Sequence, residues 1–249
     1  MGNQRLILVD GSGYIFRAFY ALPPMSREDG TPVNAVFGFT SMLLKLSEDM
    51  EGENILVVFD AARTTFRNAI YKEYKANRSE PPEELVPQFD LIKKATTAIG
   101  LKSLEVENYE ADDIIATYVK IAKKENIETL VISSDKDLMQ LIQDGVSLYD
   151  PMKNIKIGPE AVLEKFGVSP DKVIDVQALA GDSSDNVPGV PGIGVKTASQ
   201  LINEYGSLEK LLDNASSIKQ EKRRESLLNN AELAIVSKKL VSLFSDVPI

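Results

Sequence analysis

The sequence contains no cysteine and no histidine. Without cysteine the chain forms no disulfide and has no thiol chemistry, which fits the reducing cytoplasm where we expect it to act. Without histidine it lacks the commonest general base of enzymes, so any nucleophile would have to be activated by a carboxylate or a metal ion. The absence of both residue types also argues against a zinc site.

Long apolar runs are missing as well. No stretch approaches the roughly 18 residues of a membrane-spanning helix, and the first residues lack the layout of a signal peptide. The apolar run 6–9 is far too short and ends in Asp10, so we expect a buried strand there. With 249 residues and 43% hydrophobic content, the chain is long enough to bury a core. We therefore expect a globular protein with no membrane partner.

Acidic residues stand at the ends of the short apolar runs. Packed carboxylates repel one another and raise one another's pKa, so a cluster of them needs a counter-charge. Oxygen ligands alone suit Mg²⁺, with Mn²⁺ as a substitute. For any single acid a helix cap or a solvated loop end is an equally good explanation, but the joint pattern favours a site for two or more metal ions and predicts an enzyme that acts on phosphate. The nine acids are Asp10, Asp60, Glu110, Asp112, Asp113, Asp135, Asp137, Asp182 and Asp185.

The formal net charge of −9 is unusual for a protein that binds nucleic acid, where a basic balance is typical. Setting the nine acids aside leaves the rest of the chain about neutral. Two bound divalent ions would add further positive charge. The places where basic residues gather then matter more than their total.

The order of apolar runs predicts an α/β fold. We expect strands at 5–10, 54–60, 103–107 and 128–134. We expect helices at 14–20, 33–49, 110–124 and 136–143. Alternating strands and helices predict a parallel sheet covered by helices on both faces. Asp10, Asp60 and Asp135 then fall at the carboxyl ends of strands, where such sheets bind ligands.

Two segments depart from this alternation. Residues 64–100 are helical, highly charged and interrupted by Pro81-Pro82, which predicts an arch that passes over the site with little core face of its own. From about 159 to the end the pattern is helical only. We place a domain boundary near 180, between an α/β core (1–180) and a helical region (181–249).

The segment 189–202 (GVPGIGVKTASQLI) predicts a tight turn that leads into a helix. Gly192 and Gly194 permit the turn, and Lys196 and Thr197 fall in the first helical turn, where free N–H groups suit phosphate. An ordinary connection between two helices is the alternative. The spacing favours a clamp on the backbone of duplex DNA, which reads phosphates and not bases.

Basic and aromatic residues follow the strand that ends near Asp60. A solvated helix face explains most charge runs, but the position beside the acids favours a channel for single-stranded nucleic acid, with Tyr74 stacking on a base. Arg17, just after Asp10, would reach the same phosphate. The basic residues are Arg63, Arg67, Lys72, Lys75 and Arg78.

Long motifs resemble the 5′-nuclease domain of bacterial DNA polymerase I, a family that includes phage 5′-exonucleases and eukaryotic flap endonucleases. The resemblance runs from about Leu6 to the end of the chain. It implies a PIN-like core with a helical arch and a C-terminal helix–three-turn–helix DNA-binding region. The motifs are LILVDGSGYIFRAFYALP, VVFDAARTTFRNAIYKEYKANR, YEADDIIATY, ISSDKDLMQLI and LAGDSSDNVPGVPGIGVKTASQLI.

The resemblance also implies roles for individual residues. The nine acids match the family's metal ligands, Arg17, Lys75 and Arg78 match its phosphate-contacting cations, and Tyr74 matches the aromatic residue at the base of the arch. Family members hold a monovalent cation, here K⁺, on backbone carbonyls around the positions of Val190 and Ile193.

The implied function is a structure-specific 5′–3′ exonuclease and flap endonuclease on DNA, acting in primer or flap removal and repair. The expected partners are DNA with a 5′ flap, nick or recessed 5′ end, and a polymerase domain in cis or in trans. We expect a monomer associated with the bacterial nucleoid. Cleavage of an RNA primer strand stays an open alternative.

Three other functions fit less well. A non-catalytic DNA-junction binder would keep the clamp and lose several acids, yet the set is complete. A haloacid-dehalogenase-like phosphatase needs a second Asp two residues after the first, but Gly11 and Ser12 follow Asp10. A PIN-type RNase usually has three or four acids and lacks the GVPGIG turn.

Overall fold

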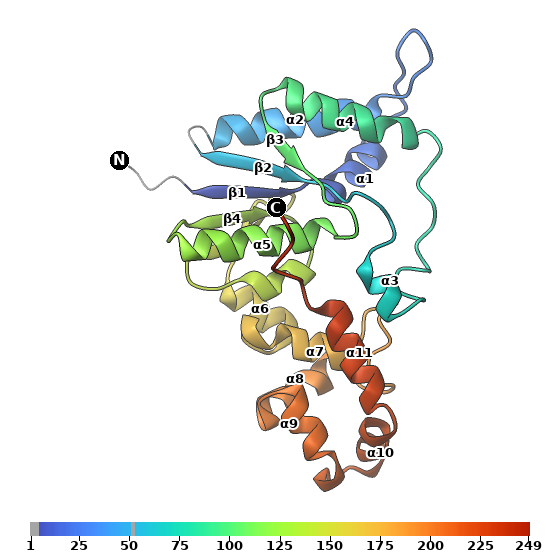
Figure 1. The fold of residues 1–249 in the computed structure, drawn as a ribbon, viewed down its shortest axis with the longest axis vertical. Helices are drawn as coiled ribbons and strands as arrows, with labels where there is room; N and C mark the ends of the chain where they lie inside the picture. Colours follow the sequence, from blue (N-terminus) through green and yellow to red (C-terminus); the bar gives the residue numbers. More distant parts are fainter. Residues whose placement is uncertain (1–4, 51–52) are drawn as a thin grey trace.

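The computed structural model describes residues 5–50 and 53–249 and has a six-stranded sheet beside a helical region (Figure 1). The strand order is β3-β2-β1-β4-β5-β6. Five strands run parallel, as the alternation with helices predicts. The strands are β1 (Leu6–Asp10), β2 (Asn54–Val58), β3 (Lys102–Leu104), β4 (Thr129–Ile132), β5 (Val146–Asp150) and β6 (Ile155–Ile157).

One edge of the sheet departs from the parallel arrangement. β6 pairs antiparallel with β5 through a short turn, so the sheet is mixed. Neither strand was expected, because each is short and polar residues interrupt its apolar pattern. The helix expected at 136–143 is a short 3₁₀ helix, η1 (Asp137–Leu141).

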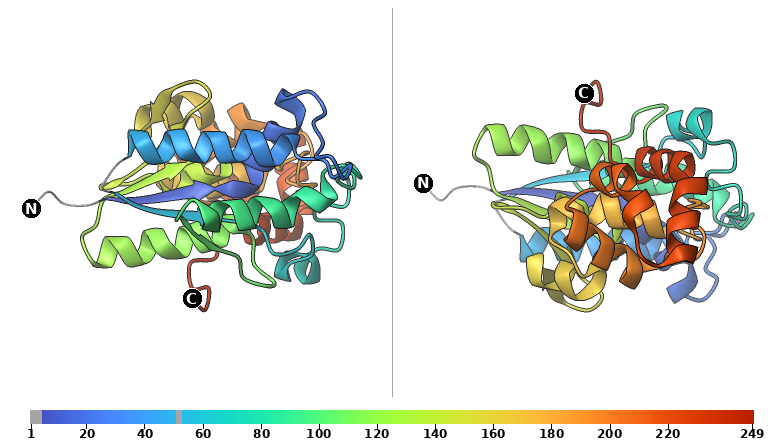
Figure 2. Two further views of the ribbon diagram at one scale, coloured as in Figure 1. Left: turned by 90° about the horizontal axis from the view of Figure 1, so that it is seen from above. Right: turned by 90° about the horizontal axis from the view of Figure 1, so that it is seen from below.

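Helices cover both faces of the sheet (Figure 2). Ile7 and Val9 of β1 point into one core, and Leu8 points into the other, because successive side chains of a strand alternate. The first face carries α1 (Gly11–Ala21), α2 (Asn34–Asp49) and α4 (Val86–Ala98), and the second carries α5 (Ala111–Lys124).

The C-terminal part of the chain is helical, as expected. A single hydrophobic cluster runs from β4, β5 and α5 into these helices, with Val131, Leu179 and Leu240 among its members. The domains therefore share a core. The helices are α6 (Pro159–Phe166), α7 (Val173–Ala180), α8 (Val195–Tyr205), α9 (Leu208–Asp213), α10 (Glu221–Asn229) and α11 (Ala231–Val241), with 3₁₀ turns η2 (Pro170–Lys172) and η3 (Ala215–Ser217).

The segment 64–100 has more core face than its charge suggested. It contains α3 (Phe66–Ile70) and α4, and Leu85 and Ile92 are fully buried. Gln88, also fully buried, accepts hydrogen bonds from the backbone N–H groups of Ala35 and Val36 and so satisfies the start of α2. The expectation of a polar arch with little core face is therefore wrong for α4, which belongs to the α/β core.

The loop between α7 and α8 folds back on itself. Gly181 and Gly189 approach so closely that a Cβ on Gly189 would lie 2.5 Å from the Gly181 nitrogen, and both have positive φ. Only glycine fits such an approach. This contact holds the 182–187 turn, with Asp182 and Asp185, beside the sheet.

Among the described residues, no helix is long and apolar enough to cross a membrane.

Candidate active site

The acids gather at the carboxyl ends of the strands, near β1, where the strand order changes direction. From β1 the connections lead to β2 and β3 on one side, and β4 and β5 lie on the other. The crevice between β1 and β4 is therefore a topological switch point, where open α/β sheets bind ligands. Asp10 ends β1, and Ser133 and Asp135 follow β4.

Asp10 and Asp60 are held by the starts of two helices. Asp10 caps α1, with its Oδ1 accepting from the Gly13 N–H at 3.3 Å. Its Oδ2 accepts from the Ser133 hydroxyl at 2.8 Å. Asp60 accepts from the Ala111 N–H at 2.7 Å, at the start of α5. Each helix N-terminus offers N–H groups that stabilise a carboxylate.

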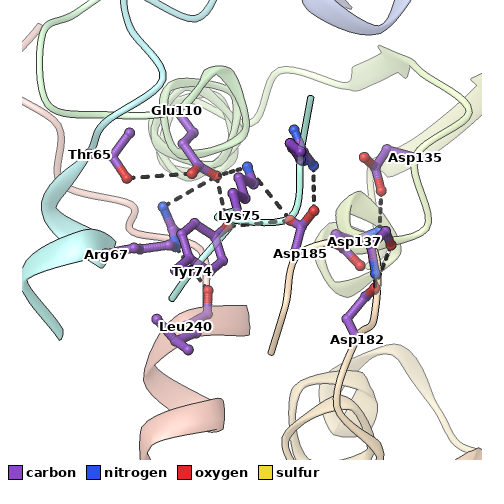
Figure 3. Close-up of polar contacts among 12 residues, drawn as sticks. Thr65, Arg67, Tyr74, Lys75, Glu110, Asp135, Asp137, Asp182, Asp185 and Leu240 are labelled. Carbon is purple, nitrogen blue, oxygen red and sulfur yellow. Dashed lines mark hydrogen bonds and ion pairs between the residues drawn. The ribbon is translucent and has the colours of Figure 1, made fainter. Parts of the chain in front are cut away.

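Glu110 and Asp185 meet around one lysine (Figure 3). The Lys75 Nζ lies 2.9 Å from Glu110 Oε2 and 3.6 Å from Asp185 Oδ2. Arg78 forms an ion pair with the other oxygen of Asp185. The predicted phosphate-contacting cations Lys75 and Arg78 therefore lie directly against predicted metal ligands, from α5 and from the α7–α8 loop.

A second group of acids lies between η1 and the α7–α8 loop (Figure 3). The Asp137 N–H donates to Asp135 Oδ1 at 2.8 Å. Lys136 forms an ion pair with Asp182. The Gln177 amide of α7 donates to Asp137 Oδ1 at 2.5 Å. This group joins the α/β core to the helical region.

Three carboxyl groups have raised pKa values. Burial raises the pKa of Asp10 to about 6, although the Ser133 hydrogen bond opposes the shift. Burial raises the pKa of Asp137 to about 7, with the charge of Asp135 adding to it. Burial and the charges of Asp135 and Asp10 raise the pKa of Asp112 well above its ordinary value. These groups lack enough positive charge around them.

The two groups of acids line a common cavity. Its volume is about 20 Å³, and its walls include Glu110, Asp112, Asp137, Asp182 and Asp185. Across residues 5–50 and 53–249, no three acidic side chains are arranged closely enough to chelate one ion as they stand. The donor set nevertheless fits hard divalent cations, because every donor is a carboxylate oxygen and several of these carboxylates lie close to other acids.

The assignment of Asp113 as a metal ligand is corrected. Asp113 is fully buried, and its two oxygens accept from the Arg67 guanidinium at 2.7 Å each. They also accept from the N–H groups of Glu110 and Phe244. Both oxygens are thus committed to protein donors, and Asp113 holds the junction of α3, α5 and the C-terminal segment.

The assignments of Arg67 and Tyr74 as nucleic-acid contacts are corrected too. Arg67 is 1% exposed and also donates to the carbonyl of Leu240, so it holds α3 against α11. Tyr74 is 4% exposed, and its hydroxyl oxygen lies 3.2 Å from Glu110 Oε2 and 3.4 Å from Asp185 Oδ2, so its single hydrogen is directed at these two carboxylates. Neither side chain presents a surface on which a base could stack.

Arg17 adjoins a different acid from Lys75. It is exposed on α1 and lines a separate cavity of about 180 Å³ with Asp10, Tyr14 and Ser133. Lys75 and Arg78 reach Glu110 and Asp185 instead. A shared phosphate contact of Arg17 with Lys75 and Arg78 stays a prediction.

The turn before α8 presents its backbone to solvent. Gly192 and Gly194 are exposed and have no neighbouring atom within 4 Å of where a Cβ would stand. Lys196 is exposed in the first turn of α8, and Thr197 is half-buried beside it. An uncrowded glycine turn with a lysine at a helix N-terminus suits the close approach of a phosphate backbone.

Sequence reasoning missed Ser133, Lys136 and Gln177. Ser133 and Lys136 flank Asp135 in the SSDKD run, and their closeness to a candidate ligand was a usable signal. Gln177 gave none, because it lies on α7 and reaches Asp137 only through the fold.

Family models identify the chain. The N-terminal resolvase-like domain of 5′–3′ exonucleases matches residues 5–167, and the C-terminal SAM fold of the same family matches residues 168–249. The chain therefore belongs to the 5′–3′ exonuclease family, which confirms the resemblance seen in its motifs. The two models meet at 167 and 168, and the boundary near 180 stays a prediction.

Its relatives include bacterial DNA polymerase I. The chain is 54% identical over 255 residues to DNA polymerase I of Rhizobium leguminosarum, covering 99% of this chain and a quarter (25%) of that protein's length. A bacteriophage T5 protein co-crystallised with metal ions shares the fold, with a TM-score of 0.83, 24% identity and coverage of 97% of this chain and 90% of the other. A T5 flap endonuclease complex with DNA and metal ions gives a TM-score of 0.80, with the same identity and coverage.

Proposed function

We propose that this chain is a structure-specific 5′ nuclease, which cuts DNA as a 5′–3′ exonuclease and as a 5′-flap endonuclease. The observation that carries the proposal is the gathering of acids at one edge of the sheet. Glu110, Asp112, Asp137, Asp182 and Asp185 line one cavity, with Lys75 and Lys136 paired to two of them. Asp10 and Asp60 adjoin this group through Ser133 and the start of α5. In a chain without histidine, metal ions held by such acids can activate the water that hydrolyses a phosphodiester.

The acids other than Asp113 would hold Mg²⁺, with Mn²⁺ as a substitute. Asp10, Asp60, Glu110 and Asp112 form one set, and the second set is Asp135, Asp137, Asp182 and Asp185. When bound, a pair of divalent ions lowers the pKa of water and stabilises the attacking and leaving oxygens of an in-line displacement.

The basic residues would orient the substrate. Lys75 and Arg78 contact the acids with side chains that are 19% and 50% exposed. An arriving phosphate could therefore replace Glu110 and Asp185 as their partner. Arg17 would hold a phosphate on the Asp10 side. Lys196, Thr197 and the Gly192–Gly194 turn would grip the duplex, with K⁺ on the carbonyls near Val190 and Ile193 as in a helix–three-turn–helix.

The relatives support a wider setting. We propose a cytoplasmic monomer that removes flaps or primers, including RNA primers, beside a polymerase domain in cis, as in the DNA polymerase I relatives, or in trans. A non-catalytic junction binder is the second candidate, and nothing in the acid set favours it.

The test is cleavage of a labelled 5′-flap duplex in Mg²⁺, beside single-stranded DNA, a 3′ flap, a blunt duplex and an EDTA control. We expect cutting near the 5′ junction that EDTA abolishes. Tight flap binding without cutting in Mg²⁺ or Mn²⁺ would instead establish the junction binder.

A further inference from the structure

A continuous chain of hydrogen bonds crosses the acid site from β1 to α7. The Ser133 hydroxyl donates to Asp10 Oδ2 at 2.8 Å and accepts from the Asp135 N–H at 3.0 Å. The Asp137 N–H donates to Asp135 Oδ1 at 2.8 Å, and Gln177 Nε2 donates to Asp137 Oδ1 at 2.5 Å. These hydrogen bonds fix three carboxylates, which are Asp10 at the end of β1, Asp135 in the loop after β4 and Asp137 at the start of η1.

The two uncharged members of this chain are held rigidly. Ser133 is 1% exposed, and its N–H continues the β4–β5 ladder by donating to the Tyr149 carbonyl at 3.1 Å. Gln177 is 3% exposed in the middle of α7. Donors fixed on a strand end and on a helix hold their acceptors more precisely than donors on a loop.

Each donor takes up one oxygen of its carboxylate. Asp10 Oδ2 accepts a hydrogen bond from the Ser133 hydroxyl at 2.8 Å, and its Oδ1 accepts a longer one from the Gly13 N–H at 3.3 Å. Gln177 makes the side-chain hydrogen bond on Asp137. Partners of this kind fix the orientation of a metal-ligating group, and losing one typically weakens metal affinity by roughly 10- to 100-fold.

We propose that Ser133 and Gln177 are positioning residues, which set the orientation of Asp10 and Asp137 and hence the geometry of the two proposed metal sets. The inference rests on the proposed function, because it assigns the two side chains a role toward the ions that the acids would hold. Neither residue touches the substrate in this account.

A purely structural role is the competing explanation. Loss of a buried hydrogen bond lowers the stability of any protein, so a lower melting temperature would not distinguish the two roles. Metal affinity decides between the two, since a structural contact distant from the ions would leave it unchanged in folded protein.

The experiment is a calorimetric titration of Mn²⁺ into the DNA-free chain, with the parent, Ser133→Ala, Ser133→Thr and Gln177→Leu compared. Ser134→Ala is the matched control, because Ser134 is exposed and adjacent. We expect roughly tenfold weaker Mn²⁺ binding in Ser133→Ala and Gln177→Leu. Ser133→Thr, which keeps the hydroxyl, and Ser134→Ala should bind as the parent does.

Single-turnover cleavage of a 5′ flap adds a second readout. Ser133→Ala should cut slowly at low Mg²⁺ and recover at high Mg²⁺, with flap affinity unchanged. Parent-like Mn²⁺ affinity in folded Ser133→Ala and Gln177→Leu would overturn this inference and leave the proposed function standing. If the parent itself binds no Mn²⁺, the proposed function fails and this inference with it. If Ser133→Ala does not fold, Ser133→Cys, whose thiol is a weak donor, takes its place.

Discussion

At the scale of single residues, two adjacent acids on α5 have opposite electrostatic surroundings. Asp113 is buried against the Arg67 guanidinium, and Asp112 faces other acids, so burial and their charges raise its pKa. Two neighbouring residues of the YEADD motif, Asp112 and Asp113, therefore have different physical roles. One holds the fold together, and the other carries a charge that the fold alone does not balance.

We predict that Asp113→Asn and Asp112→Asn change stability in opposite directions. Asp113→Asn leaves the buried Arg67 without its full counter-charge and should lower the free energy of unfolding by roughly 3–5 kcal/mol. Asp112→Asn removes a half-buried charge that faces other acids and should raise the free energy of unfolding in EDTA at pH 8. Urea unfolding of both variants beside the parent measures this. A stable Asp113→Asn protein would contradict the role given to its pair with Arg67.

The acid site also predicts how stability depends on pH. Asp10 and Asp137 have pKa values of about 6 and about 7 in the folded chain, above the ordinary value of 3.8. The folded state then binds more protons than the unfolded state between pH 4 and 7, so these groups make stability fall as pH rises through that window.

We therefore expect the metal-free chain to be more stable at pH 5.5 than at pH 7.5 in urea titrations with EDTA. Asp137→Asn should show a smaller difference between the two pH values, because one of the responsible groups is gone. Equal pH dependence in the parent and in Asp137→Asn would show that Asp137 has an ordinary pKa.

At the scale of elements, the start of α8 is the part that would hold duplex DNA. Lys196→Ala should weaken duplex binding for every sequence alike and reduce the slope of log affinity against log salt by about one, as expected for one lost phosphate contact. Lys222→Ala on α10, also exposed, is the control and should leave the slope unchanged. An unchanged slope in Lys196→Ala would argue against the clamp.

Much of the element pattern could be predicted from the sequence. Buried strands such as β1 have continuous apolar runs, and α5 opens with acids in its first turn, so both gave clear local signals. β5 and β6 did not, because polar residues interrupt their short apolar stretches. The acids could be found because each follows a strand or begins a helix, which is local information.

The remaining site features depend on packing between distant segments. Arg67 looked like one more cation of a charged helix, yet it reaches Leu240, more than 170 residues later. Its burial follows from where α11 packs, and residue type gave no sign of it. Gln177 was missed, and Tyr74 was assigned to base stacking, because the burial of both side chains depends on contacts with distant segments.

At the scale of the whole molecule, the two matched family regions share one hydrophobic cluster. Arg67 also joins the two regions, because its side chain donates a hydrogen bond to the Leu240 carbonyl. The Val247 N–H donates to the Thr117 hydroxyl and so fixes the C-terminal segment to α5. The second matched region, residues 168–249, is therefore a structural part of the site, since it carries Gln177, Asp182 and Asp185.

This shared core predicts cooperative unfolding. Urea transitions followed by far-ultraviolet circular dichroism and by a label on α10, far from the sheet, should coincide. A label transition at clearly lower urea would show that the helical region unfolds independently, and the common core would then contribute little to coupling the two parts.

The most direct test of the central claim is single-turnover cleavage of a 5′-flap duplex by the parent and by Asp10→Asn in Mg²⁺, with flap affinity measured in parallel. We expect the substitution to abolish cleavage and leave flap binding intact, because Asp10 would hold a metal ion at the reaction centre and the proposed duplex contact, Lys196, lies on a different element. Parent-like cleavage by Asp10→Asn would contradict the claim that these acids form the catalytic site.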